Sequence, residues 1–149
     1  MLKNMVATTE IVSDQLKILL AKTVDNKDKK IVNNVIEGFP ESVPTFGEPT
    51  GTVYVKGSGN FWNAQGRQNV PKNIPSVIAV IINGTEGASY KLALQINDIL
   101  LDKLQNDGDY LTLNGNVRRT FIEDNTIYIE NKNGLRTTVF FALNHEVYK

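Results

Sequence analysis

"IAVIINGTEGASYKLALQINDILLDKL", residues 78–104, is the stretch that decides the fold. It continues an apolar run over residues 76–83, which is typical of a strand buried on both faces in the middle of a sheet. From about residue 86 to 105 the apolar residues recur with the spacing of a helix. Leu94, Leu101 and Leu104 widen the apolar stripe of this helix. A stripe this wide indicates contact with more than one partner surface.

Two helices and one strand are predicted before this stretch. Residues 9–24 carry one broad apolar stripe and predict a helix. Residues 29–37 predict a shorter helix, because their apolar positions are followed by Gly38, where a C-terminal cap would stand. Prolines and glycines predict an extended connector over residues 39–51, and a strand is expected at 52–56.

The residues after the long helix predict an antiparallel meander. Asn114-Gly115 is a strong signal for a two-residue hairpin turn. Polar clusters at 123–125 and 131–134 predict two further turns. The strands expected between these turns cover residues 110–113, 116–122, 126–130 and 135–145.

The order of elements predicts an α+β fold. We expect a single mixed, mainly antiparallel β-sheet with two main helices packed on one face and a long β-arm or loop. One domain should occupy residues 1–149, with the protruding loop at about 57–75.

Composition excludes several classes of site. The chain has no cysteine and one histidine, so disulfides, thiolate catalysis and histidine-rich metal sites are excluded, and no cofactor is expected. Lysine plus arginine equals aspartate plus glutamate at 16 each, which argues against a dedicated nucleic-acid binder. No run approaches the length of a membrane-spanning helix and the N-terminus does not read as a secretory signal, so a cytoplasmic location is expected.

The loop "KGSGNFWNAQGRQ", residues 56–68, is the candidate for gripping another protein. Its glycines do not fit a phosphate-binding pattern and no helix follows them. Its polar residues from 58 to 68 include no side chain that exchanges a proton near neutral pH. Tryptophan and arginine are frequent interface anchors, so Phe61, Trp62 and Arg67 are candidate contacts with another subunit or partner. Whether Trp62 is buried within its own domain or in a neighbouring subunit stays open.

Other groups that could carry chemistry have simpler interpretations. His145 is the natural proton carrier near neutral pH, but a surface histidine at a strand end is the more economical interpretation. The basic concentration consists of Arg118 and Arg119 on a strand with Arg136 across a hairpin. These arginines either pair with Glu123, Asp124 or Glu130, or line a ring lumen or contact a partner's acidic patch.

The element order resembles that of the tail terminator proteins of tailed bacteriophages, a group that includes tail-completion or tail-to-head joining proteins. The residues that carry the resemblance are "IAVIINGTEGASYKLALQINDILLDKL" (78–104) and "GNVRRTFIEDNTIYIENKNGLRTTVFFALNHEVYK" (115–149). The first half of the chain resembles the family in layout alone, and the predicted second helix and proline-rich connector depart from it.

The resemblance implies a non-enzymatic virion protein without a cofactor. It would form a homohexameric ring that caps the tail tube, stops its polymerisation and joins the tail to the head or neck. Its partners would be other copies of itself, the tail tube protein and a head-completion or neck protein, with no membrane and no sequence-specific nucleic acid. DNA would pass through the ring, and assembly would take place in the host bacterial cytoplasm.

A ring needs two different adhesive surfaces on each subunit. The loop at 57–70 is one candidate, and the meander edge or the helix 86–105 is the other. Alternatives are another head–tail connector, neck or minor tail ring protein, a small ligand-binding or hydrolytic enzyme using His145 with Glu146 or Arg67, and a nucleic-acid-associated protein using the three arginines.

Overall fold

The structure, a computed structural model, describes residues 5–38, 48–55, 73–84, 86–131 and 135–147. Its helices are α1 (Met5–Lys22), α2 (Glu86–Asn106) and α3 (Gly108–Thr112). Its strands are β1 (Asn34–Glu37), β2 (Thr50–Val55), β3 (Asn73–Asn83), β4 (Arg119–Asn131) and β5 (Leu135–Glu146).

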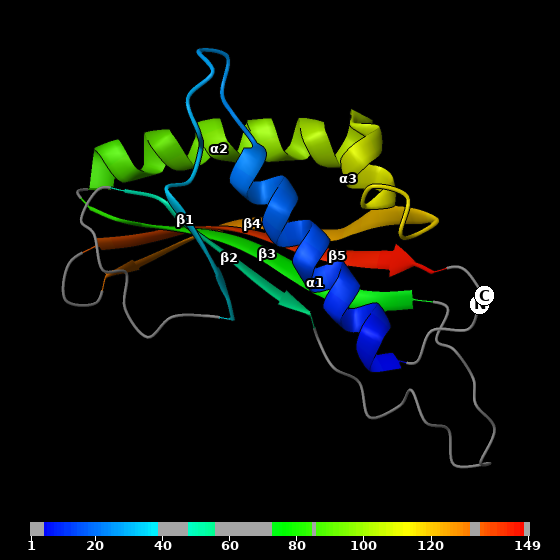
Figure 1. Ribbon diagram of the computed structural model, residues 1–149. Helices are drawn as coiled ribbons and strands as arrows, with labels where there is room; N and C mark the ends of the chain where they lie inside the picture. Colours follow the sequence, from blue (N-terminus) through cyan, green and yellow to red (C-terminus); the bar gives the residue numbers. More distant parts are fainter. Residues whose placement is uncertain (1–4, 39–47, 56–72, 85, 132–134, 148–149) are drawn as a thin grey trace.

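The five strands form one mixed sheet in the order β1-β2-β3-β5-β4. β1 runs parallel to β2, and the other neighbouring pairs are antiparallel. All three helices lie on the same side of this sheet, with α1 over the β1–β2 half and α2 over the β5–β4 half (Figure 1). The predicted α+β class, with one mainly antiparallel sheet and two main helices on one face, is confirmed.

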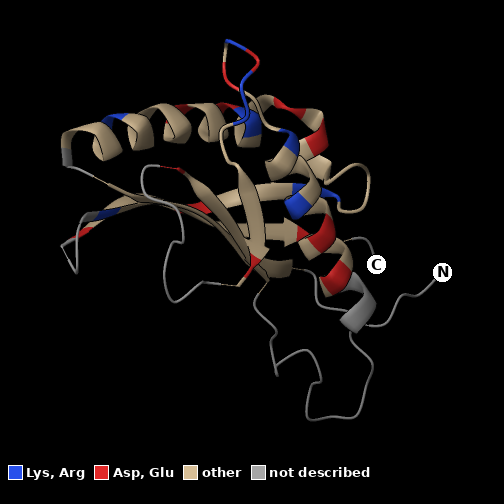
Figure 2. Cartoon of the chain, turned by 60° about the vertical axis from the view of Figure 1, so that its left-hand side comes forward, with Lys and Arg blue, Asp and Glu red and all other residues tan. Residues whose placement is uncertain are grey.

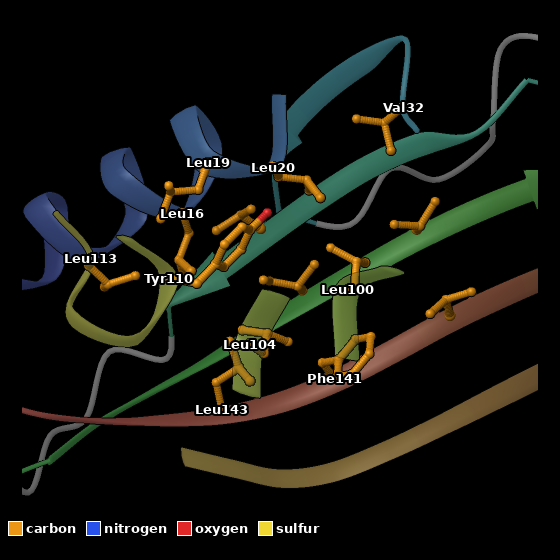
Figure 3. Packing of buried hydrophobic residues seen from close by; sticks show 14 of the residues in the cluster. Leu16, Leu19, Leu20, Val32, Leu100, Leu104, Tyr110, Leu113, Phe141 and Leu143 are labelled. Carbon is orange, nitrogen blue, oxygen red and sulfur yellow. The ribbon is translucent and has the colours of Figure 1, made fainter. Parts of the chain in front are cut away.

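The core lies between the helices and the sheet. β3 is the central strand, and its residues from Ser76 to Ile82 are buried on both faces, as the apolar run predicted. On the helix side, Leu16 of α1, Leu100 of α2 and Phe141 of β5 belong to the same buried cluster as Tyr110 (Figure 3). Each fully buried side chain of this size stabilises the fold by about 1.5–3 kcal/mol relative to its exposed state.

Tyr110 fastens α3 to the end of α1. Its hydroxyl forms a hydrogen bond with the buried Thr23 Oγ1, which in turn donates to the backbone oxygen of Leu19 at 2.7 Å. That oxygen is one of the helix-terminal carbonyls that need a partner from outside the helix. Burial raises the pKa of Tyr110 to about 12, although the hydrogen bond with Thr23 acts in the opposite direction.

The predicted helix at residues 29–37 is wrong. Ile31 and Val32 are buried in extended chain, and β1 pairs in parallel with β2. Val35 and Ile36 are β-branched and favour a strand when a neighbouring strand is present. A parallel pair needs a connection of about a dozen residues, and residues 38–49 separate the two strands in the sequence.

The predicted strand at 110–113 is also wrong, because this segment forms α3. The Asp107 side chain caps the helix by accepting a hydrogen bond from the Asp109 N–H at 2.9 Å. Asn114 and Gly115 have the positive φ angles expected of them, 56° and 86°. They end a helix here instead of joining two strands.

The predicted turn at 123–125 is a β-bulge inside one long strand, β4. The register shifts between Ile122 and Asp124, so one extra residue is inserted opposite β5. Without the bulge, Ile122 and Ile127 would point to opposite faces; with it, both point toward the helices. The polar residues that resembled a turn therefore correct the alternation of a single strand.

Gly51 of β2 lets α1 lie close to the sheet. A Cβ atom at this position would stand 2.7 Å from Leu20 Cδ2 and 3.3 Å from Val32 Cγ1. No side chain larger than hydrogen fits there without displacing the packed Leu20.

The face of the sheet opposite the helices also has buried apolar positions. Val77, Ala79 and Ile81 of β3 are at most 4% exposed. Tyr128 and Phe140 meet edge to face on the same side, with ring centroids 5.7 Å apart.

Candidate functional site

His145 is fully buried near the end of β5. Its Nε2 lies 2.6 Å from Ser76 Oγ, and its Nδ1 lies 2.8 Å from Thr120 Oγ1. Burial lowers the pKa of His145 from its usual 6.5 to about 3, so the imidazole is neutral at physiological pH. The interpretation of His145 as a surface histidine is therefore wrong.

A serine hydroxyl beside a neutral imidazole could belong to a nucleophilic pair. Here Ser76 is 1% exposed, so its hydroxyl does not reach the solvent in this conformation. The two hydroxyl partners come from β3 and β4, which flank β5 in the sheet. The geometry is that of a buried polar link across three strands.

Arg118 and Arg119 share one carboxylate. Their Nε atoms lie 3.5 and 3.6 Å from the two oxygens of Glu146, and the guanidinium of Arg119 also stands 4.8 Å from the ring centre of Phe121. An ion-paired role was anticipated, but the partner is Glu146 and not Glu123, Asp124 or Glu130. Both arginine side chains remain more than 60% exposed, so their head groups stay accessible.

Arg136 does not join these two arginines, and the predicted basic concentration is wrong. In the β4–β5 hairpin, Arg119 is opposite Glu146 and Arg136 is opposite Glu130. These pairs stand at the two ends of β5, ten residues apart, or about 33 Å of extended chain. The fusion of two expected strands into β4 is what separates them.

Phe61, Trp62 and Arg67 lie outside the described residues, as does the loop at 57–70. Residues 73–75, expected at the end of this loop, begin β3. Pro75 occurs where the described pairing with β2 has ended, at Ser76, so a proline is tolerated.

An apolar ridge follows the outer edge of the sheet beside β4. Asn125 Nδ2 donates to Asn97 Oδ1 of α2 at 2.7 Å and to the Phe140 backbone oxygen at 3.1 Å, so one side of α2 is fixed over β4. Tyr90 and Leu94 belong to the same side of α2 as Asn97, because of the helical period.

We name Tyr90, Leu94, Leu101 and Ile129 the α2–β4 ridge. Three of its members are large apolar residues with 41%, 40% and 47% exposure: Tyr90, Leu94 and Ile129. Asp98, Asp102 and Lys91 of α2 are also exposed. The wide stripe of the helix predicted this surface in part, through Leu94 and Leu101. Tyr90 and Ile129 were missed, since only the helix–strand contact shows that they lie on one edge.

A groove lies at the opposite edge of the sheet, between α1 and β1. It has a volume of about 360 Å³ and is lined by Lys17, Ile18, Ala21, Lys30, Val32, Asn33, Asn34 and Val35. We call it the α1–β1 groove. It combines an apolar floor with two lysines, and none of the described residues that line it is a carboxylate. Along α1 the acidic residues come first and the lysines follow toward the C-terminal end of the helix (Figure 2).

The described residues hold no group of three or more histidine, aspartate or glutamate side chains arranged to bind a metal ion. Asp102 accepts a hydrogen bond from Asn106 Nδ2 at 2.8 Å, as a solvated helix surface would allow. In the same part of the chain, no helix has the length and apolar character needed to span a membrane.

Compared with models of known protein families, the chain matches none. A search of curated proteins likewise gives no significant match.

Proposed function

We propose that the protein is a non-enzymatic structural protein of a tailed bacteriophage, which forms a ring that caps the tail tube. The ring would stop tube polymerisation and join the tail to the head or neck. The identification with tail terminator or tail-completion proteins rests on the resemblance of residues 78–104 and 115–149. The α+β fold is compatible with that resemblance, although a small fold of this class can serve many functions.

The α2–β4 ridge is the observation that supports a structural role best. Exposed large apolar side chains gathered at one edge mark a surface that another protein covers. The edge strand β4 lies directly beside it and pairs with β5 alone among the described strands. A partner in the form of further copies of the chain accounts for such a surface at a sheet edge, and a ring gives each copy the same environment.

Another head–tail connector, neck or minor tail ring protein would use the same surface, and it is the nearest alternative. An enzyme based on His145 receives less support. The ring is buried, its two nitrogens are already hydrogen-bonded, and its pKa of about 3 is far from the neutral range that suits a general base.

Electron microscopy of phage particles that lack the protein tests the role in tail completion. We expect overlong or unfinished tails without attached heads, because tube growth would not be stopped and the joint would be missing. Complementation with the intact chain is the control. Tails of normal length joined to heads would refute the role.

Native mass measurement tests the assembly itself. The 16.6 kDa chain should appear as a species of six times that mass, either alone or after addition of tail tubes. A chain that stays monomeric under both conditions would contradict the ring.

A further inference from the structure

We infer that the α2–β4 ridge of one copy docks into the α1–β1 groove of the next copy. The inference rests on the proposed assembly into a ring and names the two surfaces that build it. Both surfaces lie within the described residues, so the contact does not depend on the loop at 57–70.

The position of the two surfaces favours a head-to-tail contact. β1 and β4 are the opposite edges of the sheet, and α1 and α2 occupy the same layer above it (Figure 1). A second copy placed beside the first, in the strand-to-strand direction, therefore brings its α1–β1 edge against α2 and β4 in the same layer. Each copy is rotated by the same angle relative to the last, and such a succession closes into a ring when that rotation divides a full turn.

The chemistry of the two surfaces is complementary. The ridge offers Tyr90 and Leu94, and the groove offers an apolar floor that includes Ile18 and Val32. Ile18 is itself 46% exposed, which a neighbouring copy would reduce. Burial of such side chains at the centre of a contact provides most of the favourable free energy.

The charges on the two surfaces favour ridge against groove over ridge against ridge. Lys30 lines the groove and forms no ion pair within the described residues. Lys17, also in the lining, is already close to Asp14 and Glu37, at 3.5 and 3.4 Å. On the ridge side, the exposed carboxylates of Asp98 and Asp102 follow the apolar residues along α2. Ridge against ridge would bring these carboxylates together, whereas ridge against groove brings them toward a lysine.

Disulfide trapping tests the contact, because the natural chain has no cysteine. The test protein carries Ile18→Cys and Leu94→Cys together. Within one chain the two positions lie on opposite edges of the helix layer, Ile18 beside β1 and Leu94 on the β4 side of α2. A disulfide needs Cα atoms within about 7 Å, so the double variant should not close on itself.

Oxidation should convert this double variant into a ladder of dimers, trimers and larger species. The matched control joins Ile18→Cys with Tyr128→Cys, since Tyr128 is 46% exposed but lies on the helix-free face. At micromolar protein, docking should make the first pair react at least about tenfold faster than the control, because juxtaposed groups reach millimolar effective concentrations. Circular dichroism of the reduced variants establishes that both are folded.

The outcomes separate this inference from the proposed function. Ladders from the Ile18–Leu94 pair but not from the control support the docking. An assembly that forms in native mass measurement, with equal and slow cross-linking of both pairs, overturns the docking and leaves the ring intact. A chain that is monomeric with and without tail tubes overturns both.

Discussion

Because His145 is buried in its neutral form, the free energy of unfolding should depend on pH in a way that can be calculated from the structure. Lowering the pH from about 7.5 to about 5 should cost the natural protein about 2 kcal/mol more than it costs the His145→Gln variant. Glutamine can still bond one of the two hydroxyls, but it cannot titrate.

The magnitude follows from the two pKa values. Burial lowers the pKa of folded His145 to about 3, whereas the unfolded chain has the ordinary value of 6.5. Below pH 6.5 the unfolded state binds a proton that the folded state does not, so stability falls as the pH falls from 6.5 toward 3. At about pH 5 the interval is about 1.5 pH units, and each unit corresponds to about 1.4 kcal/mol.

Urea unfolding followed by circular dichroism at a series of pH values measures this difference. The carboxylates contribute equally to the pH dependence of the natural protein and of the variant. Subtracting one curve from the other therefore leaves the contribution of His145. Because the chain has one histidine, its ring resonances also give a direct titration by NMR.

Equal pH dependence in the two proteins, or a His145 resonance that titrates near 6.5, would refute the reasoning. A pKa near neutrality would also return His145 to consideration as a proton carrier, which the enzyme alternative needs. The same measurement therefore bears on both stability and function.

Three further predictions concern packing and the polar contacts between elements. Thr23→Val should lower the free energy of unfolding by about 2–3 kcal/mol, because it leaves the buried Tyr110 hydroxyl and the Leu19 carbonyl without partners. In a double-mutant cycle measured by urea unfolding, Tyr110→Phe should cost less in the Thr23→Val background than in the natural protein. Gly51→Val should lower the free energy of unfolding by about 1–3 kcal/mol, because the added side chain overpacks the contact with α1. The control Gly87→Ala should not destabilise the protein, because no atom lies within 4 Å of the added carbon. Thermal unfolding compares the two variants. Asn125→Ala should cost about 1 kcal/mol and speed amide exchange in β4, and unchanged exchange would contradict its role as the link to α2.

The central part of the fold could be predicted from the sequence because local and long-range preferences agree there. The apolar run at 76–83 suits a central strand, and the stripe at 86–105 suits a helix that covers it. β5 was also predicted, because its alternation continues without interruption. In each case one periodicity extends over enough residues to decide the element.

The errors fall where a distant partner decides the conformation. Residues 34–37 become a strand because β2 is beside them, and the sequence around them does not reveal that partner. By contrast, α3 was missed for a local reason, because the helix begins at a side-chain cap from Asp107. In β4, the consecutive polar residues Glu123, Asp124 and Asn125 have the composition of a turn but form a bulge.

The candidate site could be predicted only in part for the same reason. The width of the α2 stripe predicted an additional contact surface, and Leu94 lies on it. The grouping of Arg118, Arg119 and Arg136 failed because it assumed two short strands where there is one long strand. The register of a strand decides which residues lie opposite each other. One wrongly predicted turn therefore places a residue at the wrong end of the sheet.

The long β4 edge also indicates what kind of contact a partner makes there. An unprotected edge strand of 13 residues would pair with any extended chain. β4 has a bulge and the exposed acidic residues Glu123, Asp124 and Glu130, which are the devices that discourage such pairing. The apolar side chains above it, Tyr90 and Leu94, are left exposed on a rigid helix. A partner at this edge would therefore be recognised by the shape and charge of side chains and not by the addition of a strand.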